Sequence, residues 1–270
     1  MPCDEAFREL IREAVEKNQA YLREQDAWRD VQNFIENGPR YQGPAYMHNG
    51  VSTLACPYWI GVGNPRADIL FIGLEPAVAP EPFTLECPAN AHLWEKVCNG
   101  EDSPCSPLFQ PHVARRNLRG GHTWAIISKV IAAARRNLDW RTLFRADAFK
   151  DSLFFHCFLG EYYTRAAPNH EGAVNTGLVV NQALRRFYAR FHRVIIHGAE
   201  FLGNPLLSEL CAALNFNAQG VALAHLDGGK PLGRMTQDGR RLLLTHHLSG
   251  AAGFTNEALN QLGRHLAEAV

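Results

Sequence analysis

The sequence has no long hydrophobic run, and nothing in its 270 residues approaches the roughly 18 consecutive apolar residues of a membrane-spanning helix. Its first segment, MPCDEAFRELIREAVEKNQ, is charged throughout and lacks the apolar stretch of a secretory signal. Neither sign of charge is in excess, because Lys and Arg number 27 and Asp and Glu also number 27. This balance excludes a polybasic nucleic-acid coat protein but allows a local basic patch. We therefore expect a cytoplasmic protein without a membrane partner.

Closely spaced cysteine pairs are also absent. The seven cysteines include no CxxC pair and no Cys/His spacing of a zinc finger. Their odd number and irregular spacing favour thiols in a reducing compartment over a disulfide framework. We accordingly expect neither a metal nor another cofactor.

The composition is that of an ordinary globular protein, with 46% hydrophobic and 20% charged residues. Residues 4–36 have the apolar periodicity of a helix, and Asn37-Gly38-Pro39 predicts its end. This pattern indicates a helical extension over residues 1–40 and an α/β domain over residues 41–270. We expect the chain to be a monomer.

Short apolar runs alternate with helical segments along the rest of the chain. Strands are predicted at 67–73, 152–159, 193–198, 221–225 and 241–246, and the main helices at 122–137, 175–191, 200–214 and 255–269. Such alternation predicts a three-layer α/β/α fold with a central, mainly parallel sheet of four to five strands. The proline-rich stretch from 77 to 121 has only a short helical candidate at 90–98 and is expected to be a functional loop.

In parallel sheets, ligands bind beyond the carboxyl ends of the strands. The first predicted strand runs into Gly73-Leu74-Glu75-Pro76, and the last ends in His246-His247-Leu248-Ser249-Gly250. Glu75 would then lie at the mouth of the sheet, although a carboxylate there could instead cap a helix. Adjacent histidines in a strand point to opposite faces, so only one of the two is expected to reach a given pocket.

The segments ADILFIGLEP and LLLTHHLSG, in this order and about 170 residues apart in a predicted α/β core, resemble the uracil-DNA glycosylase superfamily. That family carries a Gly-x-(Asp/Glu)-Pro type motif after its first core strand and a His-Pro-Ser-Pro type loop after its last. The resemblance covers roughly residues 60–270 and leaves the N-terminal helix outside. It implies a DNA glycosylase that hydrolyses the N-glycosidic bond of uracil or another deaminated or damaged base.

The resemblance also implies roles for individual residues. Glu75 would stabilise the sugar cation or align water, and His246 or His247 would donate a hydrogen bond to the departing base. We prefer His247, because this alignment keeps Ser249 at the serine of the second motif. The family's base-reading Asn is missing, and His156 stands in the corresponding stretch. The base would be bound by Gly73, Leu74, Pro76, Phe83, His156 and Ser249, with Phe83 stacking on it.

The same resemblance points to DNA as the partner, double- or single-stranded. Arginines of the long loop and arginines at the start of the last strand could reach phosphates: Arg115, Arg116, Arg119, Arg240 and Arg241. Phe254 could act as a wedge in the duplex. Some branches of the family hold an iron–sulfur cluster on four cysteines. The early cysteines here do not have that spacing, so no cluster is expected.

Two other functions fit the same residues. One is a non-catalytic protein that binds a nucleotide or nucleic acid in the same pocket, favoured by the missing Asn and the absence of a basic excess. The other is a metal-assisted hydrolase that uses Glu75 and histidines at strand ends, namely His246, His247 and either His197 or His225. No short ligand spacing supports this function.

Overall fold

The computed structural model describes residues 3–38, 41, 43, 47–48, 51–52, 54, 58–73, 85–101, 106–108, 121–161, 181–198, 205–248 and 253–268. The chain divides into two compact units, each assembled from three segments. The first unit contains Met1–Gly61, Leu74–Pro107 and Glu161–Phe187, and the second contains Val62–Gly73, Leu108–Gly160 and Tyr188–Val270. The boundary expected at residue 40 does not coincide with this division.

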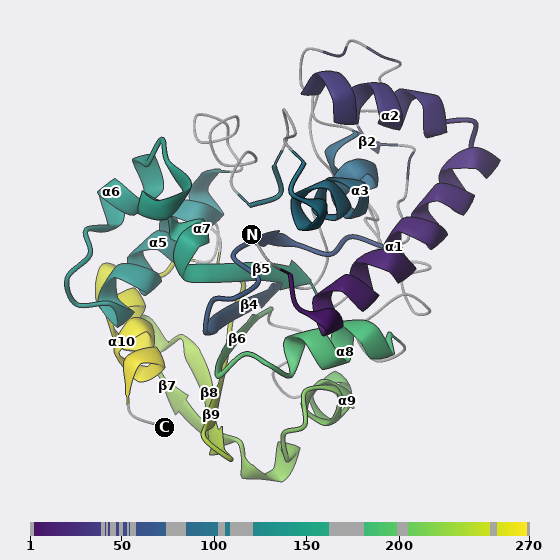
Figure 1. Ribbon diagram of the computed structural model, residues 1–270. Helices are drawn as coiled ribbons and strands as arrows, with labels where there is room; N and C mark the ends of the chain where they lie inside the picture. The colour runs from purple at the N-terminus through teal and green to yellow at the C-terminus, as the bar shows by residue number, and fades with distance from the viewer. Residues whose placement is uncertain are drawn as a thin grey trace. The chain divides into compact units, whose positions relative to one another are not determined.

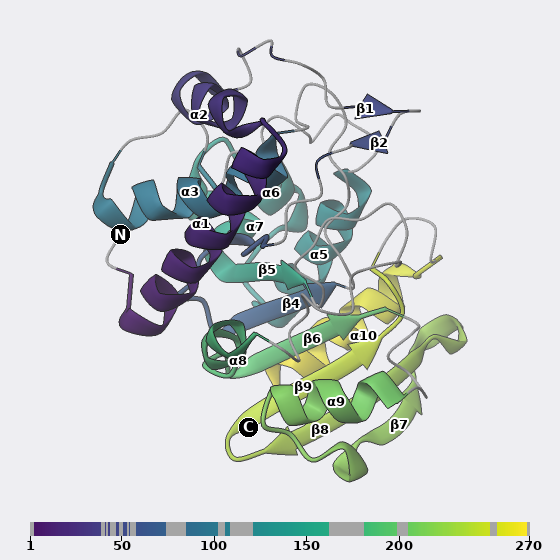
Figure 2. The same cartoon turned by 90° about the vertical axis from the view of Figure 1, so that its right-hand side faces the viewer.

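The second unit is built on a seven-stranded sheet with the strand order β3-β5-β4-β6-β9-β8-β7 (Figure 1). The strands are β3 Val62–Gly63, β4 Ile69–Gly73, β5 Cys157–Glu161, β6 Arg193–His197, β7 Ala222–His225, β8 Pro231–Gln237 and β9 Arg240–Thr245. β4, β6 and β9 pair in parallel, and β5 runs the same way beside β4 (Figure 2). The sheet is antiparallel at its margins, where β3 pairs with β5 and where β8 and β7 follow β9.

Helices cover both faces of this sheet. α5 (Gly121–Ala134) and α10 (Asn256–Ala267) lie together on one face, and α9 (Pro205–Ala213) lies on the other (Figure 2). Every residue of β4 is buried, which is typical of a strand covered on both sides. The predicted α/β/α class with a mainly parallel sheet is confirmed, although the sheet has seven strands instead of four or five.

Strand β8 is one of the two strands of this sheet that the hydrophobic pattern does not reveal. Its sequence, PLGRMTQ, contains a proline, a glycine and an arginine and has no apolar run. It forms because Asp238 and Gly239, at φ 50° and 71°, make a tight turn before β9. This turn pairs Gln237 with Arg240 and Leu232 with Thr245 in an antiparallel hairpin.

The expected strand at 152–159 is wrong in its first half. Leu153–His156 form helix α7, after the short helix α6 (Trp140–Arg145), and β5 begins only at Cys157. The backbone amide of Asn64 donates to the carbonyl oxygens of Phe154 (2.8 Å) and Cys157 (3.0 Å), which holds the junction of helix and strand. An apolar run of this length does not distinguish a buried helical turn from a strand.

A glycine allows the close approach of α10 to α5. A Cβ atom on Gly263 would lie 2.5 Å from the Cβ of Ala133 and 2.6 Å from the carbonyl oxygen of Val130. We expect Gly263→Ala to lower the free energy of unfolding by about 1–3 kcal/mol, because the overpacking outweighs the gain of about 1 kcal/mol in helix propensity. Urea denaturation measures this, with Asn260→Ala on the exposed side of α10 as the control. An unchanged midpoint for Gly263→Ala would contradict the tight packing.

The first unit contains helices α1 (Glu5–Glu24), α2 (Trp28–Asn37), α3 (Glu86–Asn99) and α8 (Gln182–Tyr188), the last of which ends at the unit boundary, and the short strands β1 (Met47–His48) and β2 (Val51–Ser52). The single helix expected at 4–36 is interrupted. Asp26 adopts φ 54°, and the amide of Ala27 bonds back to the carbonyl of Leu22. This left-handed residue ends α1 and lets α2 start in a new direction.

Two buried asparagines hold the segment 58–61 in this unit. Asn18 of α1 exchanges two hydrogen bonds with the backbone of Tyr58, at 2.7 and 3.0 Å. Asn90 of α3 accepts from the amide of Ile60 (2.9 Å) and donates to the carbonyl of Gly61 (2.9 Å). These side chains supply the partners that a neighbouring strand would otherwise provide.

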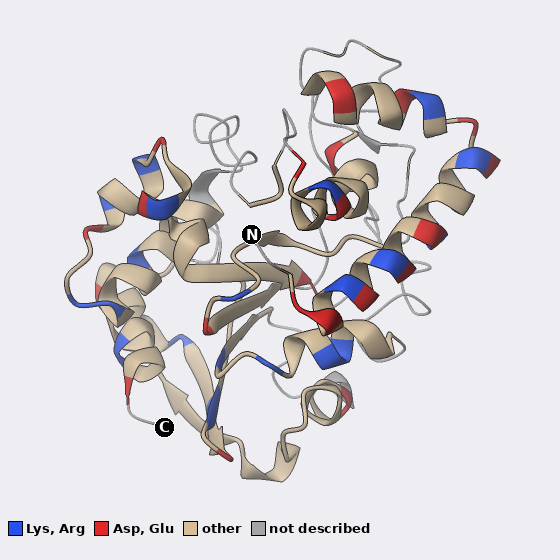
Figure 3. Ribbon diagram, in the orientation of Figure 1, with Lys and Arg blue, Asp and Glu red and all other residues tan. Residues whose placement is uncertain are grey.

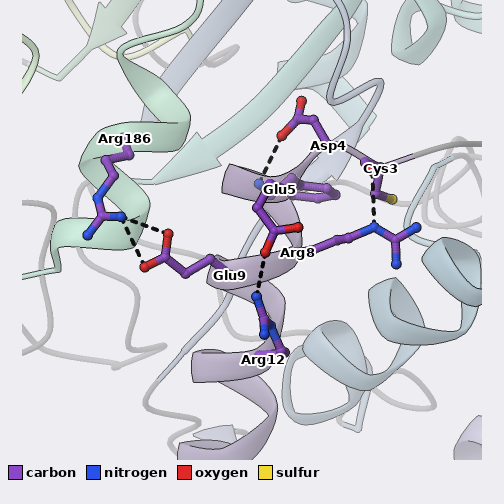
Figure 4. A network of polar contacts seen from close by, with 8 residues as sticks. Cys3, Asp4, Glu5, Arg8, Glu9, Arg12 and Arg186 are labelled. Atoms are coloured by element: carbon purple, nitrogen blue, oxygen red, sulfur yellow. Dashed lines mark hydrogen bonds and ion pairs between the residues drawn. The ribbon is translucent and has the colours of Figure 1, made fainter.

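The surface of α1 carries charges of both signs (Figure 3). Arg186 of α8 donates to both carboxylate oxygens of Glu9, at 3.1 and 2.8 Å, and Arg12 pairs with Glu5 (Figure 4). Charged side chains of α1 therefore form ion pairs within the first unit, and positive and negative charges are interspersed along the helix.

The expectation that the cysteines are free thiols is wrong for one pair. Cys3 and Cys98, 95 residues apart, form a disulfide that joins the start of α1 to the end of α3. Cysteines so far apart give no spacing signal in the sequence. The buried thiols of the described part are Cys87, Cys157 and Cys211. Among the described helices, none is both long and apolar enough to span a membrane.

Candidate functional site

The carboxyl ends of three parallel strands meet at one edge of the sheet. Ile72 of β4 and Leu244 of β9 both pair with Ile196 of β6, and the next pair in the register joins His197 to Thr245. Gly73, where the first predicted motif begins, therefore ends its strand at the same edge as β9, which carries the second motif. We call this the carboxyl edge.

The antiparallel strands bring two further residues to the carboxyl edge. β8 starts where β9 ends, so Lys230, directly before β8, lies there. β7 ends opposite the start of β8, with His225 paired to Pro231. The prediction of the site missed Lys230, because β8 was not recognised as a strand. The turn signal at Asp238-Gly239 could have placed it, since a hairpin partner of β9 must start at the edge where β9 ends.

His197 is the buried histidine of this edge. It is 6% exposed, and its ring lies 5.2 Å from the ring of His247 at an interplanar angle of 65°. Burial lowers the pKa of His197 to about 3, and the neighbouring His247 contributes in the same direction. Its imidazole is therefore neutral at physiological pH. The Nδ1 atom is buried and has no hydrogen-bond partner among the described residues.

The two histidines of the second motif differ in exposure. β9 ends at Thr245, so both follow the strand; His246 is half-buried and His247 is exposed. Leu248, the next residue, is fully buried and anchors the loop. His247 is thus accessible to a ligand and also contacts the buried His197.

Phe254 is half-buried on the same side of the second unit. Its ring centroid lies 5.9 Å from Nζ of Lys230, within reach of a cation–π interaction. The next residue, Thr255, caps α10, because its hydroxyl accepts a hydrogen bond from the amide of Ala258 at 3.0 Å. An aromatic ring and a cation therefore stand together near the strand ends.

His156 is not at the carboxyl edge. It ends α7, before the start of β5, and the charges that act on it are those of Arg135 and Asp68, which lies at the amino end of β4. Burial, chiefly, and Arg135 lower the pKa of His156, and Asp68 opposes this. Because the expected strand was misplaced, the base-reading role predicted for His156 falls on the wrong edge of the sheet.

The two arginines predicted to contact DNA from the last strand stabilise the fold instead. Arg240 donates to the carbonyl oxygens of Phe191 (3.1 Å) and Leu214 (2.7 Å). The Arg241 side chain is 7% exposed, and its Nη1 donates to the carbonyl of His265 at 2.5 Å, near the end of α10. Both begin β9, at the edge opposite His246. This placement contradicts the prediction for Arg241, since a phosphate needs an exposed cation.

Several predicted residues lie outside the described part of the chain, and their predicted roles stay predictions: Leu74, Glu75, Pro76, Phe83, Arg115, Arg116, Arg119 and Ser249. Within the described part, no group of three or more His, Cys, Asp or Glu side chains is placed to hold a metal ion. Comparison with protein-family models, with curated proteins and with solved structures gives no match for this chain.

Proposed function

We propose that the chain is a DNA base-excision glycosylase that hydrolyses the N-glycosidic bond of uracil or another deaminated base. One observation carries the proposal: the strands that lead into the two motifs, β4 and β9, flank β6 in parallel register and end at the same edge. Residues 171 positions apart, such as Gly73 and Leu244, are thereby brought within two strands of each other.

The chemistry of this bond explains the proposed residues. Water forms a bond to C1′ of the sugar while the bond from C1′ to the base nitrogen breaks, and the electron pair leaves with the base. A proton from the water ends on the base. Glu75, two residues beyond Gly73, would stabilise the positive charge on the sugar and align the water. His247 would donate a hydrogen bond to the base oxygen that gains negative charge.

DNA binding by this unit would rest on cations other than those predicted at the start of β9. Lys230 stands at the carboxyl edge beside Phe254, a ring that could fill the gap left by a flipped base. The engagement of Arg240 and Arg241 in the fold removes two phosphate contacts, which favours the second candidate function, a nucleotide- or nucleic-acid-binding protein without catalysis.

Single-turnover base release separates these two functions. Duplex and single-stranded oligonucleotides carrying uracil, hypoxanthine, xanthine or a mismatched thymine are incubated with excess protein, and unmodified oligonucleotides serve as controls. We expect time-dependent release from at least one deaminated base and none from the controls. A folded protein that releases no base would overturn the glycosylase, and binding of the same oligonucleotides would then support the second function.

A further inference from the structure

The end of strand β6 carries a polar side chain whose burial the fold alone does not explain. His197 is the last residue of β6, which lies between β4 and β9 in the sheet. It is 6% exposed, yet its Nδ1 has no hydrogen-bond partner among the described residues. Buried polar atoms in folded proteins are nearly always paired, so an unpaired one calls for a specific explanation.

The polar groups around His197 are engaged with one another. The hydroxyl of its register partner Thr245 donates to the carbonyl of Pro231 at 3.0 Å. The amide of Gly198 donates to the carbonyl of Thr245, also at 3.0 Å. His247 meets the imidazole of His197 through a ring–ring contact. Nδ1 is therefore a buried polar atom to which the described residues supply no hydrogen-bond partner.

We propose, on the basis of the function proposed above, that His197 is the residue that binds the excised base, through a hydrogen bond from Nδ1 to its lactam edge. Deaminated bases present a carbonyl next to a ring N–H, and a neutral imidazole has one nitrogen that donates and one that accepts. His197 takes the role that the sequence assigned to His156, because it lies at the edge where the two motifs end.

This assignment also explains the position of His247. His197 and His247 are in contact, so a base bound at Nδ1 of His197 lies within the neighbourhood of the proposed hydrogen-bond donor to the departing base. One histidine would hold the base, and the other would stabilise the charge that develops on it. The ligand class is a free or flipped-out lactam base, such as uracil or hypoxanthine.

Two substitutions with the same number of side-chain heavy atoms test the hydrogen bond. In His197→Asn the amide keeps a polar atom near the position of Nδ1, whereas His197→Leu removes it. We expect His197→Leu to lower the single-turnover efficiency of base release by roughly tenfold, mainly by raising the protein concentration that gives half of the maximal rate. His197→Asn is expected to retain most of the wild-type efficiency. His197→Leu is expected to keep or raise the melting temperature, because it removes an unpaired polar group from the interior.

The outcomes distinguish this inference from the proposed function. If the wild type releases base and His197→Leu releases it equally well, the role of His197 is overturned and the glycosylase stands. A lower melting temperature together with lost activity in both variants would point to a purely structural role. Titration of the ¹⁵N-histidine-labelled wild type with free uracil gives a readout that needs no catalysis. A shift of the Nδ1 resonance of His197 in an inactive protein would support base binding alone, and neither release nor a shift would overturn both.

Discussion

Glu75→Gln is expected to slow base release by about 100- to 1,000-fold, the usual cost of removing one preorganised group that stabilises transition-state charge. Glutamine keeps the size of the side chain and its hydrogen bonding but carries no negative charge. The loss should appear in the maximal single-turnover rate and not in half-saturation, because the sugar becomes cationic only as the bond breaks. Measurement with saturating protein and the preferred oligonucleotide isolates that rate.

Glu16→Gln provides a matched control for this substitution. Glu16 lies on the exposed side of α1 in the first unit, so the same change of charge there should leave the rate unaltered. If Glu75→Gln retains the wild-type rate while His247→Ala loses it, the electrostatic centre would lie on the histidine of the second motif. If Glu75→Gln, His247→Ala and Glu16→Gln all release base at the wild-type rate, neither motif takes part in catalysis.

The strands that are covered on both faces could be predicted from the sequence almost to the residue. β4 is a continuous apolar run that is buried throughout, and β9 contains a buried run of three leucines after its two arginines. The structure starts β4 only two positions later than expected. Burial on both sides forces this composition, so the sequence carries the information locally. β8 could not be found in this way, because its position depends on a hairpin with β9 and not on its own residues.

The roles of single polar residues depend on contacts between distant segments. Arg241 was a reasonable DNA-binding candidate in the sequence, but its partners are His265 in the last helix and Glu268 directly after it, 24 and 27 residues away. His197 could be placed at a strand end, whereas its burial and its unpaired Nδ1 follow from packing. The sequence therefore predicts which strand ends meet at the carboxyl edge, but it does not predict the contacts of the side chains there.

Acidification from pH 7 to pH 5 is expected to destabilise the protein by about 4 kcal/mol, shared equally between His92 and His197. Burial lowers the pKa of His92 to about 4, and burial followed by the nearby His247 lowers that of His197 to about 3, from an ordinary value of 6.5. Between these values and 6.5, the unfolded chain binds more protons than the folded chain. The free energy of unfolding therefore falls as the pH drops through 6.5, and at pH 5 each histidine contributes about 1.5 pKa units, or roughly 2 kcal/mol.

Urea denaturation at the two pH values, with His92→Leu and His197→Leu, separates the two contributions. His92 lies on α3 with its ring 4.7 Å from that of Trp28, in the first unit, and His197 belongs to the second. Each substitution should remove about half of the loss between pH 7 and pH 5, because an aliphatic side chain binds no proton in either state. His225→Leu is the control, since His225 is exposed on β7. A loss of stability between pH 7 and pH 5 that both buried substitutions leave unchanged would show that neither histidine has a lowered pKa in the folded protein.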